Sequence, residues 1–370
     1  MELLVAADDR TGAFETAAAI ADRGVGPVPV TPWPDAPAGV AVAVIDLACR
    51  HLSPADAAER AADIPDARYQ AHKTDSTLRG NWADELVARS AARAVLLVPA
   101  LPAQGRTCVG GVVYDHGRPV HEGAAGTDVR RRVLTARPAE ALRAAGGRVV
   151  RELADDDAVT AWLAAPDGVA VADAGDDAAI DRIVERWRSD AEAVVLAGTS
   201  AVTAGAAQTV ATGRPTAILP AIEGPVLVVC GSVHPASRRQ LDFAEHRGVS
   251  VSYLADDISA RTLERDGTLV FASEIPVGDV TEPMAVAAAA SLARGVDDLR
   301  HHTDIGALVL LGGDTASAVL GDAAVSVYGS VDVGTAWARV ESFDVPVITR
   351  SGGFGSDSAL FDLLGRLGRS

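Results

Sequence analysis

The sequence predicts an α/β protein with two lobes, each a mostly parallel sheet flanked by helices, and a β-hairpin inserted in the N-terminal lobe. Apolar runs of strand length recur along the chain and alternate with alanine-rich stretches of helical periodicity. Such alternation is typical of parallel sheets with helices on both faces. The 370 residues fit two domains, and 48% of them are hydrophobic, which is enough for two cores.

The expected strands form two series, with helical stretches between most of them, such as 11–23, 54–62 and 235–247. Residues 111–122 differ, because two short apolar runs flank Asp115-His116-Gly117, which is typical of a hairpin. The strands of the first series are 3–7, 40–47, 94–98, 168–172 and 193–197, and those of the second are 226–230, 250–254, 268–272, 307–311 and 345–349.

Residues 208–225 are the expected linker, because glycines and prolines gather there with little periodicity and an apolar strand follows at once. The predicted domains are therefore 1–210 and 222–370. In folds of this kind we expect ligands in the cleft between the lobes, at the carboxyl ends of the strands.

Composition limits the classes of partner. The formal net charge of −17 argues against nucleic acid or an anionic membrane surface as the main partner, although a small anion remains possible. Cys49, Cys108 and Cys230 lie far apart, without metal-type spacing, and are expected to be free core thiols. No run of about 18 apolar residues occurs, and the N-terminus reads as a first strand. We therefore expect a cytoplasmic protein that forms, at most, a homo-oligomer.

The first motif is residues 8–13, directly after the first expected strand. Asp8 and Asp9 are adjacent carboxylates that can accept hydrogen bonds from substrate hydroxyls or take a proton from one. Thr11 and Gly12 allow an anionic group to approach the start of the next helix closely. The alternative is that Asp9 or Thr11 merely caps that helix.

The second motif is residues 72–81, between an extended segment and a helix. Lys73 is the only lysine, whereas the other 32 basic residues are all arginine. A compact ammonium at a tight site cannot be copied by a guanidinium, so Lys73, Ser76 and Arg79 are expected to hold a substrate carboxylate. Asp75 would bind hydroxyls or orient Lys73. The alternative is a surface lysine beside a helix cap.

The third motif, residues 99–107, brings the Gln104 amide and the Arg106 guanidinium to the end of another strand. A turn stiffened by proline explains this segment equally well.

The C-terminal lobe carries three glycine-rich turns, each directly after an expected strand. Backbone NH groups and hydroxyls in such turns suit phosphates, although each turn alone has an ordinary structural explanation. No G-x-x-x-x-G-K-[ST] or G-x-G-x-x-G motif occurs, and the neighbouring His301 and His302 are expected on a solvated helix face rather than at a metal. The turns contain Ser232 and His234, then Gly312, Gly313, Asp314 and Thr315, and finally Gly352 and Gly353.

Taken together, these motifs resemble the four-carbon acid sugar kinases, which phosphorylate tetronates such as threonate, erythronate and 3-oxo-tetronate. The likeness runs nearly end to end. The family's D-D-x-T-G-A is similar to residues 8–13, K-x-D-S-T-L-R-G-N to 73–81 and P-A-x-P-x-x-G-R-T to 99–107. Its G-S-x-S-x-A-T-x-x-Q resembles residues 231–240, G-G-E-T resembles 312–315 and K-S-G-x-F-G resembles 350–355.

The resemblance implies an N-terminal lobe for the sugar acid and a C-terminal lobe for ATP with Mg²⁺. It assigns Asp8, Asp9, Lys73, Asp75, Ser76 and Arg79 to the substrate, and Ser232, Gly312, Gly313, Asp314, Thr315 and Gly352 to ATP. Three positions depart from the family: His234 replaces a usual serine, Asp314 a glutamate and Arg350 a lysine.

Phosphoryl transfer requires positioning, charge neutralisation and an oriented hydroxyl. Asp9 is the preferred general base, ahead of Asp75, and Lys73 is expected to contact the substrate carboxylate or the transferring phosphoryl group. Two other functions remain open on the sequence, a nicotinamide-dependent hydroxy-acid dehydrogenase and a non-catalytic sugar-acid sensor. The exact sugar acid and the hydroxyl that is phosphorylated do not follow from these residues.

Overall fold

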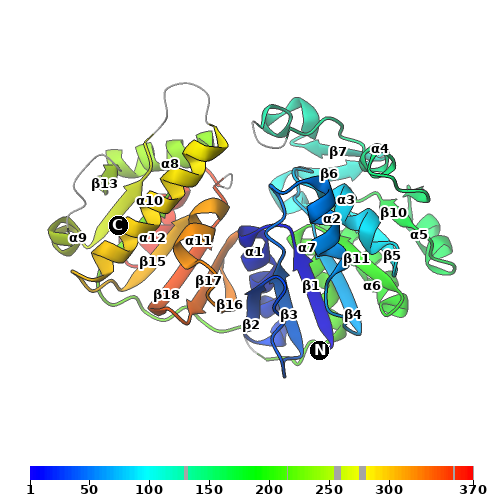
Figure 1. Ribbon diagram of the computed structural model, residues 1–370, viewed down its shortest axis with the longest axis horizontal. Coiled ribbons are helices and arrows are strands. Elements are labelled where there is room, and N and C mark those ends of the chain that lie inside the picture. Colours follow the sequence, from blue (N-terminus) through cyan, green and yellow to red (C-terminus); the bar gives the residue numbers. More distant parts are fainter. Residues whose placement is uncertain (129–131, 215, 254–259, 275–280, 353–354, 370) are drawn as a thin grey trace. The chain divides into compact units, whose positions relative to one another are not determined.

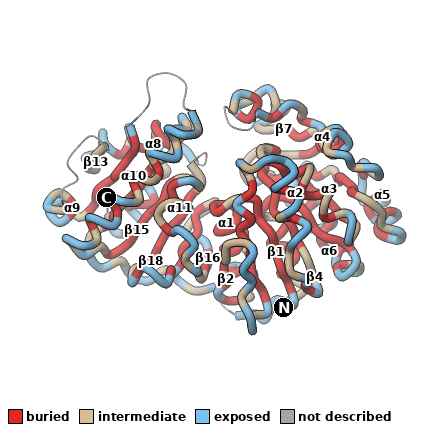
Figure 2. Tube along the Cα trace, in the orientation of Figure 1, coloured by how far each residue is buried: buried red, intermediate tan, exposed pale blue. Residues whose placement is uncertain are grey.

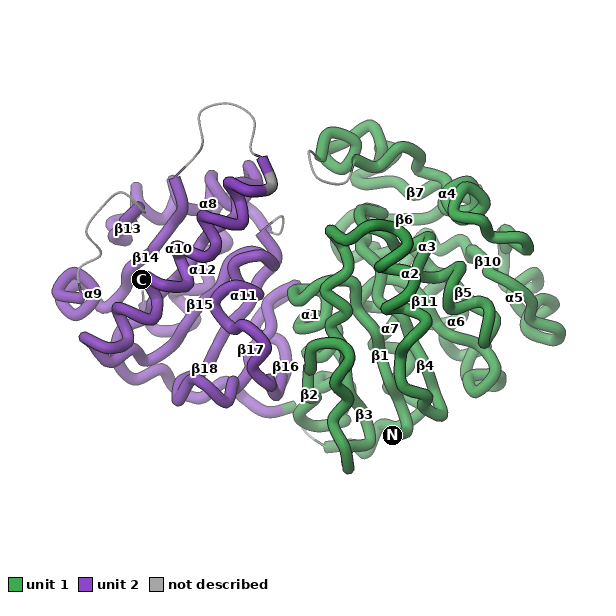
Figure 3. Tube along the Cα trace, in the orientation of Figure 1, with its two compact units in different colours: residues 1–216 green, residues 217–370 purple. Residues whose placement is uncertain are grey.

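The computed structural model describes residues 1–128, 132–214, 216–253, 260–274, 281–352 and 355–369. The chain divides into two compact units, Met1–Thr216 and Ala217–Ser370 (Figure 3). The division falls inside the glycine- and proline-rich segment expected to be the linker. In both units the strands of the main sheet form the buried centre and the outer helix faces are exposed (Figure 2).

The main sheet of the first unit has the order β2-β3-β1-β4-β11-β5-β10-β9, and all of its neighbouring pairs are parallel (Figure 1). The central strands β1, β3, β5, β10 and β11 are short and mostly apolar, as strands buried on both faces are, whereas β4 and the edge strand β9 carry polar residues. The strands are β1 Leu3–Ala7, β2 Val28–Pro32, β3 Val42–Asp46, β4 Tyr69–Lys73, β5 Ala94–Val98, β9 Val150–Leu153, β10 Val169–Ala172 and β11 Val194–Gly198.

Helices cover both faces of this sheet. Helix α1 packs on α7 and α7 packs on α6, whereas α3 packs on both α2 and α4. The connections therefore leave the neighbouring strands β1 and β4 toward opposite faces, through α1 and α3. In open α/β sheets, ligands bind at such a point of reversal. The helices are α1 Arg10–Ile20, α2 Pro54–Ala62, α3 Trp82–Arg89, α4 Pro138–Ala144, α5 Asp156–Leu163, α6 Asp177–Trp187 and α7 Ser200–Gly205.

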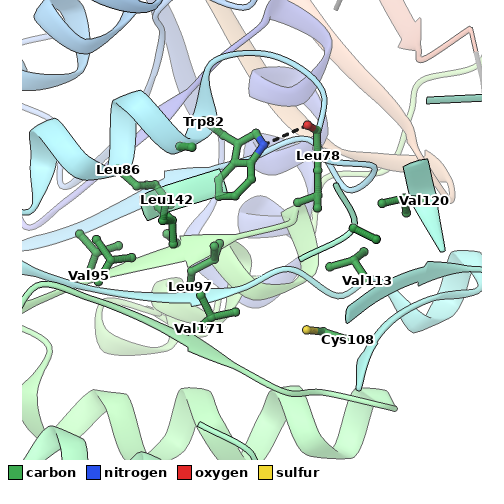
Figure 4. Close-up of a cluster of buried hydrophobic side chains, with 14 of the residues drawn as sticks. Leu78, Trp82, Leu86, Val95, Leu97, Cys108, Val113, Val120, Leu142 and Val171 are labelled. Carbon is green, nitrogen blue, oxygen red and sulfur yellow. Dashed lines mark hydrogen bonds between the residues drawn. The ribbon is translucent and has the colours of Figure 1, made fainter. Parts of the chain in front are cut away.

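The inserted feature expected near residue 115 is a small antiparallel sheet of three strands, with the order β6-β7-β8. Strands β7 (Val112–Asp115) and β8 (Arg118–Pro119) form the expected hairpin, and β6 (Arg106–Val109) extends it. Cys108 and Val113 anchor this small sheet in a core shared with α3, α4 and the main sheet (Figure 4).

The second unit has a sheet of the order β13-β14-β12-β15-β18-β17-β16. The first five strands are parallel, and β16, β17 and β18 form an antiparallel meander. The strands are β12 Val226–Cys230, β13 Ser250–Tyr253, β14 Thr268–Ala272, β15 Ala307–Leu311, β16 Val325–Asp332, β17 Thr335–Val340 and β18 Phe343–Arg350.

Helices α8 and α12 pack together on one face of this second sheet, where Leu241 and Leu363 meet Val228 and Val309. Helices α10 and α11 pack together as a separate pair. The connections after the neighbouring strands β12 and β15 thus lead to different helix layers, which gives this unit its own point of reversal. The helices are α8 Pro235–His246, α9 Ala260–Asp266, α10 Glu282–Arg300, α11 Gly313–Leu320 and α12 Ala359–Arg366.

Several elements differ from the expectation. Strand β2 contains two prolines, which hid it, and β16 alternates buried with half-buried residues instead of forming an apolar run. The helix expected over 11–23 is α-helical only to Ile20 and continues as a π-helical turn, with Gly24 at φ 85°. Leu254, the last residue of the strand expected over 250–254, lies outside the described residues.

The three cysteines are free and buried, as expected. His301 and His302 follow α10, are exposed, and each donates a hydrogen bond from Nδ1 to a backbone carbonyl four residues earlier. Within the described ranges, no helix is both long and apolar enough to cross a bilayer.

Candidate functional site

The candidate site of the first unit forms where β1 and β4 end side by side. Ala7 pairs with Lys73 in the register of these two strands, so the residues that follow them start at the same edge of the sheet. Asp8 and Asp9 continue from β1 into α1, and the segment from Thr74 to Asn81 leads from β4 to α3. The first two sequence motifs therefore meet, although about 65 positions separate them.

A third segment, after β3, brings Arg50 between the acidic residues of both motifs. Its Nε and Nη2 donate to Asp8 Oδ2 and Oδ1 at 2.7 and 3.0 Å, and its Nη1 donates to Asp9 Oδ2 at 2.8 Å. Asp75 Oδ1 lies 3.5 Å from Arg50 Nη2. Asp8 is fully buried, and its bidentate ion pair with Arg50 supplies the partner that a buried carboxylate requires.

Asp75 organises the turn that follows β4. Its carboxylate accepts hydrogen bonds from Arg79 Nε at 3.1 Å, Arg79 Nη2 at 2.9 Å, the Arg79 amide at 3.2 Å and the Thr77 amide at 3.1 Å. The Thr77 hydroxyl donates to the same carboxylate. Asp75 therefore fixes the direction of the Arg79 guanidinium, which points on toward Asp128 at 3.7 Å.

Leu78 fastens this turn to the core. Its side chain is buried, its φ of 65° lies in the left-handed region, and its carbonyl accepts a hydrogen bond from Trp82 Nε1 at 2.9 Å (Figure 4). A leucine adopts this conformation only where its surroundings hold it there. The leucine of the motif is thus an anchor, and the polar residues on either side of it belong to the site.

Lys73 is buried, which rules out the alternative of a surface lysine. Because side chains alternate along a strand, His72 points toward α3, where its Nε2 lies 2.8 Å from Glu85 Oε2, and Lys73 points toward α1. Lys73 Nζ donates to the Thr74 carbonyl at 3.0 Å, and a Cβ atom at Gly12 would lie 3.2 Å from Nζ. The ammonium thus lies beside the first turn of α1.

The third motif joins the same edge through Arg106. Arg106 Nη1 donates to Ser76 Oγ at 3.1 Å and to Gln104 Oε1, and Arg106 Nε lies 3.6 Å from Asp115 Oδ1 on β7. The structure therefore brings Arg106 of the third motif to the same edge as the six residues that the resemblance assigned to the substrate, which are Asp8, Asp9, Lys73, Asp75, Ser76 and Arg79.

The two candidate bases differ in proton affinity. Burial raises the pKa of the Asp9 carboxyl, Arg50 and Lys73 lower it and Asp8 raises it, and the balance stays above the ordinary value. Burial also acts to raise the pKa of Asp75, but Arg79 and Arg50 outweigh it and hold that pKa well below its usual range. Asp9 is consequently the better proton acceptor of the two.

Asp9 also caps α1, because its Oδ1 accepts a hydrogen bond from the Gly12 amide at 2.8 Å. Asp9 can therefore cap α1 and still offer its carboxylate to a substrate. Its side chain is 18% exposed, so one edge of the carboxylate remains open to solvent.

Arg50 is the residue that the sequence reasoning missed. The sequence predicts the strand at residues 40–47, but Arg50 follows that strand outside the three motifs. A basic residue directly after a strand that neighbours β1 is the signal that was available, because parallel strands end at one edge.

In the second unit, the three predicted turns follow β12, β15 and β18, which are adjacent in the sheet. Their contacts hold them together: Ser237 Oγ donates to Ser232 Oγ at 3.0 Å and to the Gly352 carbonyl at 2.5 Å. The Gly231 amide donates to Thr315 Oγ1 at 3.0 Å. The turns therefore form one surface of backbone groups and hydroxyls.

Glycine is required where these turns touch. A Cβ atom at Gly352 would overlap the Ser232 hydroxyl and lie 2.9 Å from Ser237 Oγ, and one at Gly231 would lie 2.7 Å from Thr315 Oγ1. Gly312, at φ 104°, precedes α11, and no side chain caps the N-terminus of that helix in the described part of the chain. The first amides of α11 and its positive dipole end thus suit a phosphate.

The departures from the family pattern now have a structural setting. His234 is the N-cap of α8, and its Nδ1 accepts a hydrogen bond from the Ala236 amide at 3.2 Å, a role that serine also fills. Arg350 is buried and donates to the Ala359 carbonyl at the start of α12 at 3.0 Å. Gly353 lies outside the described residues.

Among the described residues, no group of three or more His, Cys, Asp or Glu side chains is arranged to hold a metal ion.

Two family models match the chain in agreement with this division of chemistry. A sugar-binding N-terminal domain matches residues 3–206, and a nucleotide-binding C-terminal domain matches residues 227–360. The charged cluster lies in the first match and the glycine-rich turns lie in the second.

Two curated relatives carry the same name. A D-threonate kinase of Salmonella typhimurium strain LT2 is 28% identical over 423 residues, covering 98% of both chains. A D-threonate kinase of Bordetella bronchiseptica strain RB50 is 32% identical over 323 residues, which cover 78% of this chain and 75% of the relative.

A solved structure from Salmonella typhimurium LT2 shares the fold, with a TM-score of 0.75 over 100% of this chain and 99% of that one, at 19% identity. The chain therefore belongs to the four-carbon acid sugar kinase family, a family of small-molecule kinases with an N-terminal sugar-binding and a C-terminal nucleotide-binding domain.

Proposed function

We propose that the protein transfers the γ-phosphate of ATP to a hydroxyl of a four-carbon sugar acid. D-threonate is the first candidate substrate, because both relatives described above are D-threonate kinases, and erythronate and 3-oxo-tetronate are the others. The observation that supports this most is the cluster of Asp9, Arg50, Lys73 and Asp75 at the point of reversal of the first sheet. It offers fixed positive charge beside a carboxylate with a raised pKa.

The cations of this cluster would hold the carboxylate of the sugar acid. Lys73, Arg79 and Arg106 supply charge, and the Ser76 hydroxyl supplies a neutral partner. Charge-assisted hydrogen bonds of this kind are the stronger ones, and arginine can make two in parallel to one carboxylate. Asp8 and Asp9 would accept hydrogen bonds from the sugar hydroxyls through lone pairs that Arg50 leaves available.

Asp9 would act as the general base and Asp75 as the group that positions Arg79. The pKa of Asp9 is raised, and its carboxylate keeps an exposed edge. Asp75 has a depressed pKa, and its two oxygens already accept hydrogen bonds from Thr77 and Arg79. A carboxylate surrounded by donors in this way is a weak proton acceptor.

The nucleotide would bind on the three turns of the second unit. The amides at the start of α11, the hydroxyls of Ser232 and Thr315 and the glycine backbone at Gly312 and Gly352 suit its phosphates. Mg²⁺ would arrive with the nucleotide and neutralise phosphate charge, and Asp314 is the carboxylate nearest to those turns in sequence.

In the transfer, the substrate hydroxyl oxygen forms a bond to the γ-phosphorus, and the bond from that phosphorus to the bridging oxygen breaks to release ADP. The hydroxyl proton passes to Asp9 and then to solvent. Little covalent chemistry is left to the protein, so positioning and charge carry most of the rate enhancement.

The test is to incubate the enzyme with ATP–Mg²⁺ and each of D-threonate, erythronate and 3-oxo-tetronate. Phosphorus NMR would detect a new phosphomonoester, and a coupled assay would measure ADP. We expect sugar-acid-dependent ADP release with at least one of them, and Asp9→Asn should lower kcat by about 10²–10⁴-fold.

Two results would contradict the proposal. If a sugar acid raises the melting temperature but no phosphomonoester forms, the protein is a sensor that retains only the binding site. If NAD raises the melting temperature and ATP does not, the nucleotide assignment fails. A homo-oligomer stays a prediction, which the molar mass in solution would test.

A further inference from the structure

In the first unit, the Arg50 guanidinium contacts three carboxylates. No sequence motif contains Arg50. Its three guanidinium nitrogens each face a carboxylate: Nε and Nη2 bind Asp8, Nη1 binds Asp9, and Nη2 also lies 3.5 Å from Asp75. Its side chain is only 14% exposed. The planar guanidinium group of arginine has donors in fixed directions, so it can donate hydrogen bonds to several carboxylates at once.

The backbone that carries Arg50 is held from three sides. The amides of Cys49 and Arg50 both donate to the Asp8 carbonyl, at 3.0 and 3.2 Å. Asn81 Nδ2 donates to the Cys49 carbonyl at 2.9 Å, which links this loop to the start of α3. Ala48 lies at φ 47°, a conformation that a tightly held loop imposes on a residue with a side chain.

A buried polar cluster lies beneath the same loop. Cys49 Sγ donates to Glu85 Oε1 at 3.2 Å, and Glu85 Oε2 lies 2.8 Å from His72 Nε2. All three side chains are fully buried. Glu85 thereby ties the residue before Arg50 to the residue before Lys73, so the two cations are positioned by one network.

Gly80 completes this arrangement. It lies at φ 89°, and a Cβ atom there would come within 3.2 Å of Arg50 Cγ and 3.4 Å of Asp8 Oδ2. The glycine of the second motif therefore leaves the room in which the Arg50 side chain reaches the carboxylates.

We propose that Arg50 is a positioning residue for Asp9, which it holds ionised and in a fixed orientation so that Asp9 can accept the substrate proton. This rests on the proposed function. Arg50 and the Gly12 amide occupy one oxygen each of the Asp9 carboxylate, which fixes its plane. The remaining lone pairs then have defined directions for a substrate hydroxyl.

The charges around Asp9 show why one arginine matters. Asp8 and Asp46 face it with negative charge, and Arg50 and Lys73 face it with positive charge. Without Arg50, Lys73 would be left as the positive charge that acts on Asp9 against the neighbouring Asp8, whereas Asp46 would keep Arg10 at 3.7 Å. Asp9 would then take up a proton at a higher pH, and a protonated carboxyl cannot act as a base.

The experiment measures the protonation of Asp9 directly, without turnover. Aspartate labelled with ¹³C at the carboxyl would be titrated by NMR in the parent, Arg50→Gln and Arg50→Lys, and Asp9→Asn would identify the Asp9 signal. We expect the midpoint of Asp9 to rise by about 1–3 pH units in Arg50→Gln. In Arg50→Lys the retained charge should keep the rise below about one unit.

Steady-state kinetics of the same variants then distinguish the effect of losing the charge of Arg50 from the effect of changing its geometry. We expect kcat to fall in both variants, also in Arg50→Lys, while KM for ATP stays near the parent value and the acidic limb of the rate profile moves up only in Arg50→Gln. Arg68→Gln is the matched control, because Arg68 is an exposed arginine that pairs with Glu2 and Glu192. It should change neither readout.

A midpoint in Arg50→Gln within about half a unit of the parent would overturn the inference. So would an Arg50→Lys variant with full kcat. If Arg50→Gln does not fold, the double variant Asp8→Asn/Arg50→Gln removes the unpaired buried charge and takes its place in the titration. If the parent phosphorylates no sugar acid, the proposed function fails, and the NMR titration still decides whether Arg50 holds Asp9 ionised.

Discussion

The two units use the same position in a parallel sheet for opposite kinds of chemistry. At the ends of β1 and β4, buried charged side chains gather, with Arg50 and Lys73 among three aspartates. At the ends of β12, β15 and β18, backbone groups and hydroxyls gather, and side chains are kept small. The topology thus selects where a ligand binds, and the loop residues select which ligand.

The difference predicts different sensitivities. A site built from paired charges should respond strongly to any change of charge, because the opposite charge of the neighbour offsets the desolvation cost of each buried ion. A site built from close backbone contacts should respond to added volume instead, since its turns already touch. Substitutions of each kind in each unit would break or sharpen this contrast.

The largest effect is expected at Lys73. Lys73→Met removes the ammonium, and Lys73→Arg keeps the charge but changes the size and geometry of the head. The lost charge-assisted contact should cost about 2–4 kcal/mol, or roughly 30- to 1000-fold in kcat/KM. Melting temperature and kcat/KM would be measured for both beside the parent. If both variants melt normally and keep near-parent activity, Lys73 has no part in the site.

The next effect concerns Asp46, at the end of β3 beside this cluster. Burial raises the pKa of Asp46 to about 6, against the attraction of Arg10, whose Nη1 lies 3.7 Å away. The pKa of Asp46 in the folded protein exceeds the ordinary value of 3.8. The contribution of this group to the free energy of unfolding is therefore fully present below about pH 4 and is lost as the pH rises through 6. Between these pH values the free energy of unfolding should fall by about 3 kcal/mol on account of Asp46.

Asp46→Asn keeps the hydrogen bond that the Ala48 amide donates, at 2.9 Å in the parent, without the titration. The free energy of unfolding of the parent relative to this variant should therefore fall as the pH rises from 4 to 7. A relative stability that is flat over this range, or that rises, would show that Asp46 does not titrate near 6.

In the second unit, Gly352→Ala should act through volume. The new Cβ would overlap Ser232 Oγ, so the turns must move apart, at a cost of about 1–3 kcal/mol in nucleotide affinity. Calorimetric titration with an ATP analogue would measure this. Gly175→Ala is the control, because a Cβ there meets only Val109 Cγ2, at 3.8 Å. Equal affinity in Gly352→Ala and the parent would show that the turns adapt freely.

The smallest effect is expected at His234. His234→Ala removes the cap of α8 and should lower stability by about 1 kcal/mol, whereas His234→Ser should restore most of it. Thermal unfolding of the three proteins would measure both steps. An alanine variant as stable as the parent would mean that the imidazole does not serve as a cap.

Much of the site was predictable from local pattern. The end of β1 is visible in the sequence because this buried parallel strand is a continuous apolar run, so Asp8 and Asp9 could be placed there. The three glycine-rich turns were recognised in the same way. Lys73 could be placed only at the end of an extended segment, because β4 is not an apolar run. Strands β2, β6, β9, β16 and β17 were not predicted. Two prolines conceal β2, β9 has two exposed charged residues at its centre, and β16 alternates buried with half-buried residues, so none of these three is a continuous apolar run.

The sequence by itself determined the α/β class, the order of the two chemistries along the chain and the residues of the three substrate motifs. Only the tertiary structure decided which residue balances the acidic ones. Arg50 lies in no recognisable motif and reaches Asp8, Asp9 and Asp75 because β3, β1 and β4 are neighbours. The opposite pKa shifts of Asp9 and Asp75 were likewise decided there, since a carboxyl's pKa depends on burial and on charges that only folding brings near.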